Sequence, residues 1–142
     1  SFMRAVSRSG WLGAEEEAAE NAFRILHLLK LDHLWDQEAS KLSGGQMKLL
    51  EVGRALMSGA KLLMMDEPAA GVNPVLAHEV FAKFRELKDR LGVTFLLIEH
   101  RLEIALKYTD YVYAMASGVV VSEGKPESVM ADPQVIEAYL GG

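Results

Sequence analysis

Apolar residues in the first part of the chain recur at helical spacing. Between residues 14 and 30, Ala19, Phe23 and Leu26 lie three or four positions apart, and the acidic residues 15–17 fall where a helix dipole favours negative charge. This pattern predicts a helix with one apolar face that needs a partner. Residues 1–13 show no period and contain two glycines, so we expect a loop or a frayed end there.

A second helix and a strand are predicted between residues 43 and 66. Ser43 is a good N-cap for a helix that runs to about Met57, because its side chain can accept a backbone N–H of the first turn. The run 62–65 is short and uniformly apolar, which is typical of a strand buried on both faces. We therefore expect this strand to carry Asp66 and Glu67 at its C-terminal end.

The alternation of helices and strands continues to the end of the chain. Asn73 and Pro74 provide an N-cap and a first-turn proline for a helix that ends at Gly92. The β-favouring run 93–98 then leads to Glu99 and His100. We also predict a short helix, two strands around a turn and two terminal helices, at residues 102–107, 111–115, 119–121, 126 onward and 132–140. A strand, a helix and a strand with such connections predict parallel pairing, so the fold class is α/β.

Composition excludes several classes of protein. The chain has 142 residues, half of them apolar, and is expected to bury a core and to form one domain. The net charge is −5 and the basic residues are scattered, which argues against a nucleic-acid surface. The lack of cysteine excludes disulfides and thiolate metal sites, and no apolar run approaches the roughly 18 residues that a membrane span needs.

Two carboxylates follow the first predicted strand, and ligands of open parallel sheets bind beyond the carboxyl ends of the strands. An aspartate that closes an apolar strand, such as Asp66, can hold Mg²⁺ through water. Glu67 would then point to the other side of the pleat, free to act on an attacking water. The alternative is a polar strand exit that begins a turn before Pro68. His100 taken alone is more often structural or exposed than catalytic.

The segment Ser43-Gly44-Gly45 has the composition of a phosphate-binding turn. Two glycines let the backbone approach a ligand closely, the hydroxyl can donate a hydrogen bond, and the N-terminus of the helix behind them favours anions. The alternative is an ordinary helix cap after a flexible turn. These residues alone leave both interpretations open.

In this order and at this spacing, the segments resemble the ATPase domain of ABC transporters. Residues 42–46, Leu-Ser-Gly-Gly-Gln, match the family's signature motif residue for residue, and residues 62–66 match its Walker B strand. Glu67 matches its catalytic glutamate and His100 its switch histidine. Residues 69–74 stand at its D-loop, and this loop and the ending at 132–141 are similar to the ATPase subunits of branched-chain amino acid importers.

The resemblance implies roles in a nucleotide sandwich between two ATPase protomers. Asp66 would order Mg²⁺, Glu67 would polarise the water, and His100 would contact the γ-phosphate of ATP in its own protomer. Asn73 lies in the loop between the two sites, where many relatives have aspartate. The γ-phosphate of ATP held by the opposite protomer would be touched by Ser43, Gly44, Gly45 and Gln46. The implied partners are that second protomer and membrane permease subunits, at the inner face of the cell membrane.

The resemblance also implies how the chain is organised. Residues 14–57 correspond to part of the helical subdomain with the signature motif, and residues 58–142 to the C-terminal part of the ATPase core. The expected fold is a partial P-loop NTPase fold, a mostly parallel sheet with flanking helices. Neither the Gly-x-x-x-x-Gly-Lys-Ser/Thr motif nor a Q-loop segment occurs in the sequence. We therefore expect unpaired strand edges, closed by rearrangement or by strand exchange with a second copy.

Two hypotheses of different class remain open. The first is an ATP-binding and ATP-hydrolysing component of an importer for branched-chain amino acids. The second is a truncated, non-catalytic ABC ATPase fragment that folds or oligomerises without hydrolysing ATP. Such a fragment could still bind a partner through the helical face of Phe23, Leu26 and Leu29. The missing phosphate-binding motif favours the second hypothesis for the chain by itself and predicts a low ATP affinity.

Overall fold

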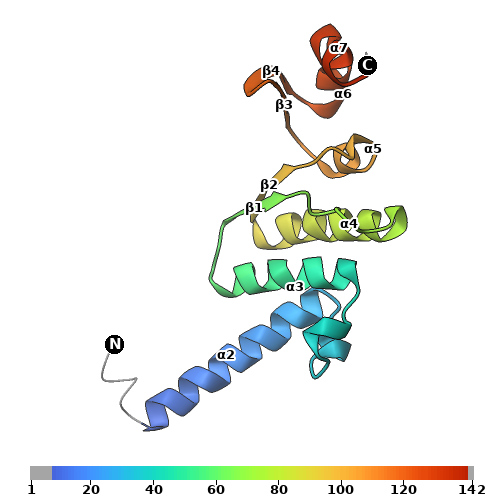
Figure 1. Cartoon of the computed structure of the whole chain (residues 1–142). Coiled ribbons are helices and arrows are strands. Elements are labelled where there is room, and N and C mark those ends of the chain that lie inside the picture. The colour runs from blue at the N-terminus through green and yellow to red at the C-terminus, as the bar shows by residue number, and fades with distance from the viewer. Residues whose placement is uncertain (1–7, 141–142) are drawn as a thin grey trace. The chain divides into compact units, whose positions relative to one another are not determined.

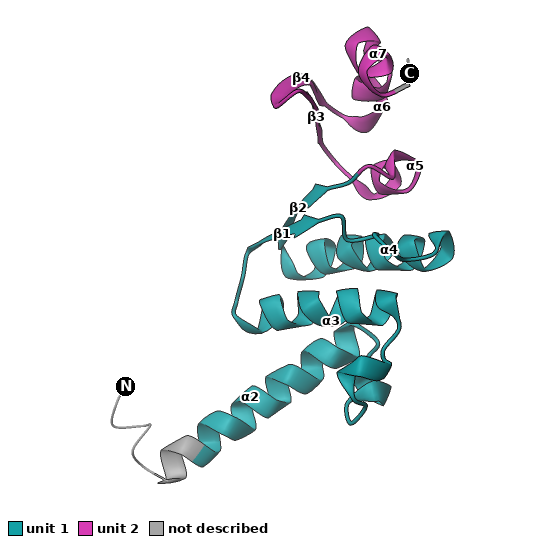
Figure 2. Ribbon diagram, viewed as in Figure 1, with its two compact units in different colours: residues 1–99 teal, residues 100–142 magenta. Residues whose placement is uncertain are grey.

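The computed structural model describes residues 8–140 and the side chains of residues 12–139. The chain divides into two compact units, residues 1–99 and 100–142 (Figure 2). The expected organisation into residues 14–57 and 58–142 stays a prediction, and the division after residue 99 follows the packing. The physical reason is that the second unit buries apolar residues among themselves, with Ala114, Val129 and Val135 packed against Val112 and Val121.

The first unit is a stack of helices on a small sheet. In Figure 1, α3 lies between α2 and α4, and α4 lies against the sheet. Its largest fully buried side chains include Leu29, Val52, Phe81 and Leu87. The elements are α2 (Arg8–Leu28), the 3₁₀ turns η1 (Asp32–Leu34) and η2 (Ala39–Lys41), α3 (Gly44–Met57), β1 (Leu62–Asp66), α4 (Pro74–Leu91) and β2 (Thr94–Ile98).

Helix α2 begins at Arg8, six residues before the expected start. Residues 8–13 are therefore helical rather than a loop, and residues 1–7 lie outside the described part of the chain. Gly10 and Gly13 each cost a helix only about 1 kcal/mol, and without a proline the hydrogen-bonded turns continue through them. Leu29 at the other end is buried, so of the helical face suggested for a partner only Phe23 remains exposed and Leu26 is half-buried.

Strands β1 and β2 pair in parallel, as the sequence predicts, with Met64 opposite Leu96 and Asp66 opposite Ile98. One face of this pair packs on α4, where the rings of Phe84 and Phe95 stack at 5.0 Å. The other face is open within the first unit, because no second layer among that unit's described residues covers it. Its exposed apolar side chains are Leu62, Met64, Leu96 and Ile98, with Met64 72% exposed. The expectation that β1 is buried on both faces is therefore wrong.

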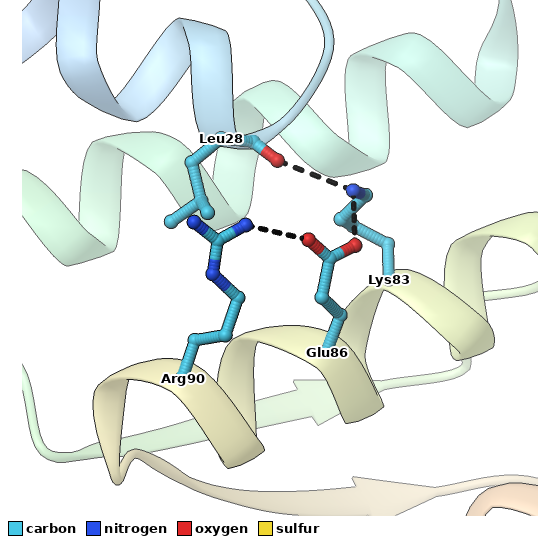
Figure 3. Close-up of polar contacts among 4 residues, drawn as sticks. All are labelled: Leu28, Lys83, Glu86 and Arg90. Carbon is cyan, nitrogen blue, oxygen red and sulfur yellow. Dashed lines mark hydrogen bonds and ion pairs between the residues drawn. The ribbon is translucent and has the colours of Figure 1, made fainter.

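A buried lysine links α4 to the end of α2 (Figure 3). Lys83, only 8% exposed, donates to the carbonyl of Leu28 at 3.2 Å and to the carboxylate of Glu86. Arg90 donates to the other oxygen of that carboxylate at 2.9 Å. The hydrogen bond from Lys83, and then that from Arg90, lowers the pKa of Glu86 below its usual range.

This network gives the stability of the first unit a pH dependence at acid pH. Because the pKa of Glu86 is lower in the folded state, its contribution is complete above the usual glutamate pKa and is lost as the pH falls through the folded value. We expect Glu86→Gln to flatten the fall in unfolding free energy between about pH 5 and pH 3. Lys83→Met removes the main cause of the lowered pKa of Glu86 and should flatten the same fall in unfolding free energy. Urea unfolding at several pH values measures this, and two unchanged slopes would contradict it.

The second unit is a β-hairpin with short helices. It comprises α5 (Leu102–Ala105), η3 (Leu106–Tyr108), β3 (Val112–Ala116), β4 (Val119–Gly124), α6 (Pro126–Met130) and α7 (Pro133–Leu140). β3 and β4 are antiparallel, and Ser117 and Gly118 between them both have positive φ, as a two-residue hairpin turn requires. The sheets of the described residues are thus two separate pairs, β1–β2 and β3–β4, with the unpaired edges that the sequence predicted. Exchange of a strand with a second copy stays a prediction.

No helix in the described part of the chain is long and apolar enough to cross a membrane.

Candidate functional site

Helix α3 begins with a complete capping box. Ser43 is the N-cap, and its Oγ accepts the N–H of Gln46 at 3.3 Å. In return the Oε1 of Gln46 accepts the N–H of Ser43 at 2.8 Å. The predicted N-cap is confirmed, and the side chain of Gln46 is shown to hold the turn in which the signature residues lie.

The two glycines at the start of α3 are not demanded by the chain's own packing. Neither Gly44 nor Gly45 has a positive φ. A Cβ on exposed Gly44 would come no closer than 3.8 Å to Val72, and one on buried Gly45 would lie 3.6 Å from Val80, both ordinary contacts. A side chain is thus sterically possible at either position, and close approach of a phosphate to these glycines stays a prediction from the sequence.

Strand β1 ends at Asp66, and the chain turns sharply at the next residue. Glu67 has a φ of 45°, in the left-handed region that residues other than glycine seldom adopt. Its N–H donates to the carbonyl of Ile98 at 2.8 Å, which extends the pairing with β2 by one bond. The regular strand therefore ends at Asp66, and the direction of the Glu67 side chain stays a prediction.

The loop from Glu67 to Asn73 is tied down at both ends. The N–H of Ala70 donates to the carbonyl of Glu67 at 2.9 Å, and the N–H of buried Ala69 donates to the carboxylate of Glu99 at 2.9 Å. Asn73 caps α4 by accepting the N–H of Leu76 at 2.9 Å, and Pro74 follows at the first position, as predicted. Val72 in this loop is the residue that faces Gly44, so the start of α3 and the loop after β1 lie together.

Asp66 is the candidate metal ligand. It is exposed at the carboxyl end of β1 and lines a groove of about 360 Å³ between α3 and β1. Within the described residues, no group of three or more His, Cys, Asp or Glu side chains could hold a metal ion. A single carboxylate at a strand end fits Mg²⁺, which keeps several waters and takes its remaining ligands from substrate phosphates.

His100 is the first residue of the second unit, where it is exposed and lies in neither a helix nor a strand. Its assignment as the switch histidine stays a prediction. The residue that sequence reasoning passed over is Glu99, which it placed after β2 without a role. The only available signal was that it follows directly on a strand that ends at the site.

Two family models match the sequence. The model described as "ABC transporter" matches residues 3–70, a range that includes Ser43, Gly44, Gly45, Gln46, Asp66 and Glu67. The model described as "Branched-chain amino acid ATP-binding cassette transporter" matches residues 119–142. The chain belongs to the ABC transporter ATP-binding family. Its described structure, mixed α/β with small sheets, agrees with a partial P-loop fold of ABC ATPase type.

ABC transporter relatives from archaea and bacteria match most of the chain. The "Probable branched-chain amino acid transport ATP-binding protein LivG" of Archaeoglobus fulgidus is 63% identical over 131 residues, 92% of this chain and 51% of the relative. The protein of that name from Methanocaldococcus jannaschii is 53% identical, with 92% and 52% covered. The "High-affinity branched-chain amino acid transport ATP-binding protein BraF" of Pseudomonas aeruginosa is 36% identical, with 90% and 50% covered. The chain thus spans about half the length of these curated relatives.

Solved ABC ATPase structures have the same fold. An ATP-binding cassette of an ABC transporter in its ADP conformation is 52% identical, with a TM-score of 0.81 over 89% of this chain and 51% of that one. A part of the ABC transporter complex cbiONQ from Clostridium perfringens is 32% identical, with a TM-score of 0.79 over 87% of this chain and 49% of that one.

Proposed function

We propose that this chain supplies half of an ATP site and part of the ATPase core in an ABC importer for branched-chain amino acids. The observation that carries the proposal is the pair of structurally dispensable glycines at the capped start of α3, next to the loop that follows Asp66 and Glu67. The transported solute class comes from the names of the relatives, which are 36–63% identical.

The site residues divide the work between phosphate binding and water activation. Ser43, Gly44, Gly45 and Gln46 bind the γ-phosphate of ATP held by a second protomer, because a capped helix start offers backbone N–H groups and a favourable dipole. ATP and Mg²⁺ supply the phosphoryl chemistry when bound, and Asp66 holds the ion. Glu67 accepts a proton from the attacking water, His100 contacts the γ-phosphate, and Asn73 shapes the loop between the two sites.

The partners in this proposal are a second ATPase protomer and membrane permease subunits. Phe23 and Trp35 form an exposed aromatic pair with ring centroids 5.7 Å apart, 48% and 63% exposed, on the helical part that we assign to permease contact. A large exposed aromatic pair is a typical anchor of a protein interface. The complex acts at the inner face of the cell membrane.

The second candidate is a non-catalytic ABC ATPase fragment that associates with itself. The open face of β1 and β2, with Leu62, Met64, Leu96 and Ile98, favours it, since such faces drive association. The sequence carries no Lys-containing phosphate-binding motif, so we expect the chain by itself to bind ATP weakly. Adding that motif to the chain distinguishes the two candidate functions, because only the first predicts ATP hydrolysis by the resulting protein.

A completed cassette tests the proposal. We define it as this 142-residue chain joined to the part of the Archaeoglobus fulgidus relative that the chain does not match, where the family's phosphate-binding motif is expected. In cells that lack a LivG-type subunit, the completed cassette should restore uptake of labelled leucine above the level given by the relative's part alone. ATP hydrolysis without leucine uptake would support the ATPase part of the proposal and contradict the proposed solute class. Neither hydrolysis nor uptake from a folded protein would favour the second candidate.

A further inference from the structure

The carboxylate of Glu99 reaches from the end of β2 to the loop that follows β1. It accepts the N–H of Ala69 at 2.9 Å, across 30 positions of sequence. Ala69 is fully buried, as is Pro68 before it, whereas Glu67 is exposed. The hydrogen bond therefore anchors the buried side of a turn whose exposed side carries Glu67.

The backbone at Glu67 needs such an anchor. A left-handed conformation costs a residue other than glycine on the order of 1–2 kcal/mol, so it persists only where the surroundings impose it. Two backbone bonds impose it here, from the N–H of Glu67 to Ile98 and from the N–H of Ala70 to Glu67. Glu67 takes part in both bonds, once through its N–H and once through its carbonyl. Glu99, at the end of the neighbouring strand, adds a side-chain hydrogen bond to this turn, and a carboxylate acceptor makes such bonds shorter and stronger.

We propose that Glu99 is a positioning residue for Glu67. By holding the N–H of Ala69, it fixes the turn after β1, and thereby the place from which the carboxylate of Glu67 meets the attacking water. The proposal rests on the proposed ATPase function, because it gives Glu99 a part in the same reaction. Glu99 itself is not assigned contact with ATP, Mg²⁺ or the water.

The first measurement concerns the hydrogen bond and uses the 142-residue chain itself. We expect the amide of Ala69 to exchange its hydrogen about tenfold faster in Glu99→Ala than in the unchanged chain. Glu99→Gln keeps an acceptor oxygen at the same position and should stay within about threefold. The control is Glu79→Ala, at an exposed position of α4, which should leave the exchange at Ala69 unchanged.

The second measurement concerns the reaction and uses the completed cassette. We expect Glu99→Ala to lower kcat for Mg-ATP about tenfold with KM within about twofold, since positioning of the base acts on the chemical step rather than on ATP binding. Glu99→Gln should recover most of kcat. If Glu99 had only a structural role, Glu99→Ala would lower the stability of the protein and would not lower kcat selectively at an unchanged KM.

The outcomes separate this inference from the function on which it rests. Unchanged exchange at Ala69 in Glu99→Ala would overturn the anchor, whatever the turnover. Faster exchange with an unchanged kcat would overturn the positioning role and leave the proposed ATPase standing. A folded, unsubstituted completed cassette without turnover would overturn the proposed function, and the positioning role with it. Faster exchange together with a lower kcat, both recovered by Gln, would support the inference.

Discussion

Glu67→Gln is expected to lower the Mg-ATP turnover of the completed cassette by about 10²- to 10⁴-fold, because the amide cannot accept the proton of the attacking water. Stability should change little. The side chain is exposed, and the bonds that shape its turn, to Ile98 and from Ala70, are made by backbone atoms that the substitution keeps. Phosphate release measures the turnover, and urea unfolding measures the stability.

Glu79→Gln is the matched control for this prediction. It makes the same chemical change at another exposed position of the same unit, on α4, and should leave turnover within about twofold. Turnover that survives Glu67→Gln would remove Glu67 from the base role. A loss that accompanies unfolding would not count for the prediction, which requires a folded protein with intact ATP binding.

Ser43→Asp should separate the structural role of the N-cap from its proposed role toward phosphate. Aspartate caps helices as well as serine, so the unfolding free energy should stay within about 0.5 kcal/mol of the original. The added carboxylate would face the γ-phosphate at the start of α3. At about 4 Å and an effective dielectric constant near 20, the repulsion is about 4 kcal/mol, and we expect turnover to fall by at least about 10²-fold.

Two further variants complete that test. Asn73→Asp makes a comparable change at the other confirmed N-cap, where Oδ1 accepts the N–H of Leu76, and it should cost far less turnover. Ser43→Ala removes the cap without adding charge and should lower stability by about 1 kcal/mol. If Ser43→Asp lost turnover only as much as Ser43→Ala did, the phosphate role of this residue would be rejected and the simple helix cap preferred.

Local signals in the sequence predicted the elements of this chain well. Ser43 and Asn73 were identified as N-caps because each precedes an apolar helical pattern, and both make the expected side-chain bond. Gly92 ends α4 in a left-handed conformation, as a glycine after the last helical turn does. The parallel pairing of β1 with β2 followed from the helix between them. The two caps and the end of α4 each depend on residues near one another in sequence, whereas the strand pairing followed from the order of the elements.

Features that depend on distant residues could not be predicted in the same way. A uniformly apolar run such as β1 looks the same whether one face or two are covered, and only the layers around it decide. The left-handed turn at Glu67 depends on Ile98, and the bond that holds Ala69 comes from Glu99, each about 30 positions away. No local pattern marks these pairs. The candidate site residues were found from motifs, while their geometry required the structure.

We propose that the 142 residues carry the signature and water-activating parts of an ATP site. Phosphate release from Mg-ATP by the completed cassette tests this, with the relative's part alone as the blank. We expect turnover that requires the 142-residue chain and is lost in Glu67→Gln. A folded completed cassette that releases phosphate no faster than the blank, or equally fast with Glu67→Gln, would contradict it.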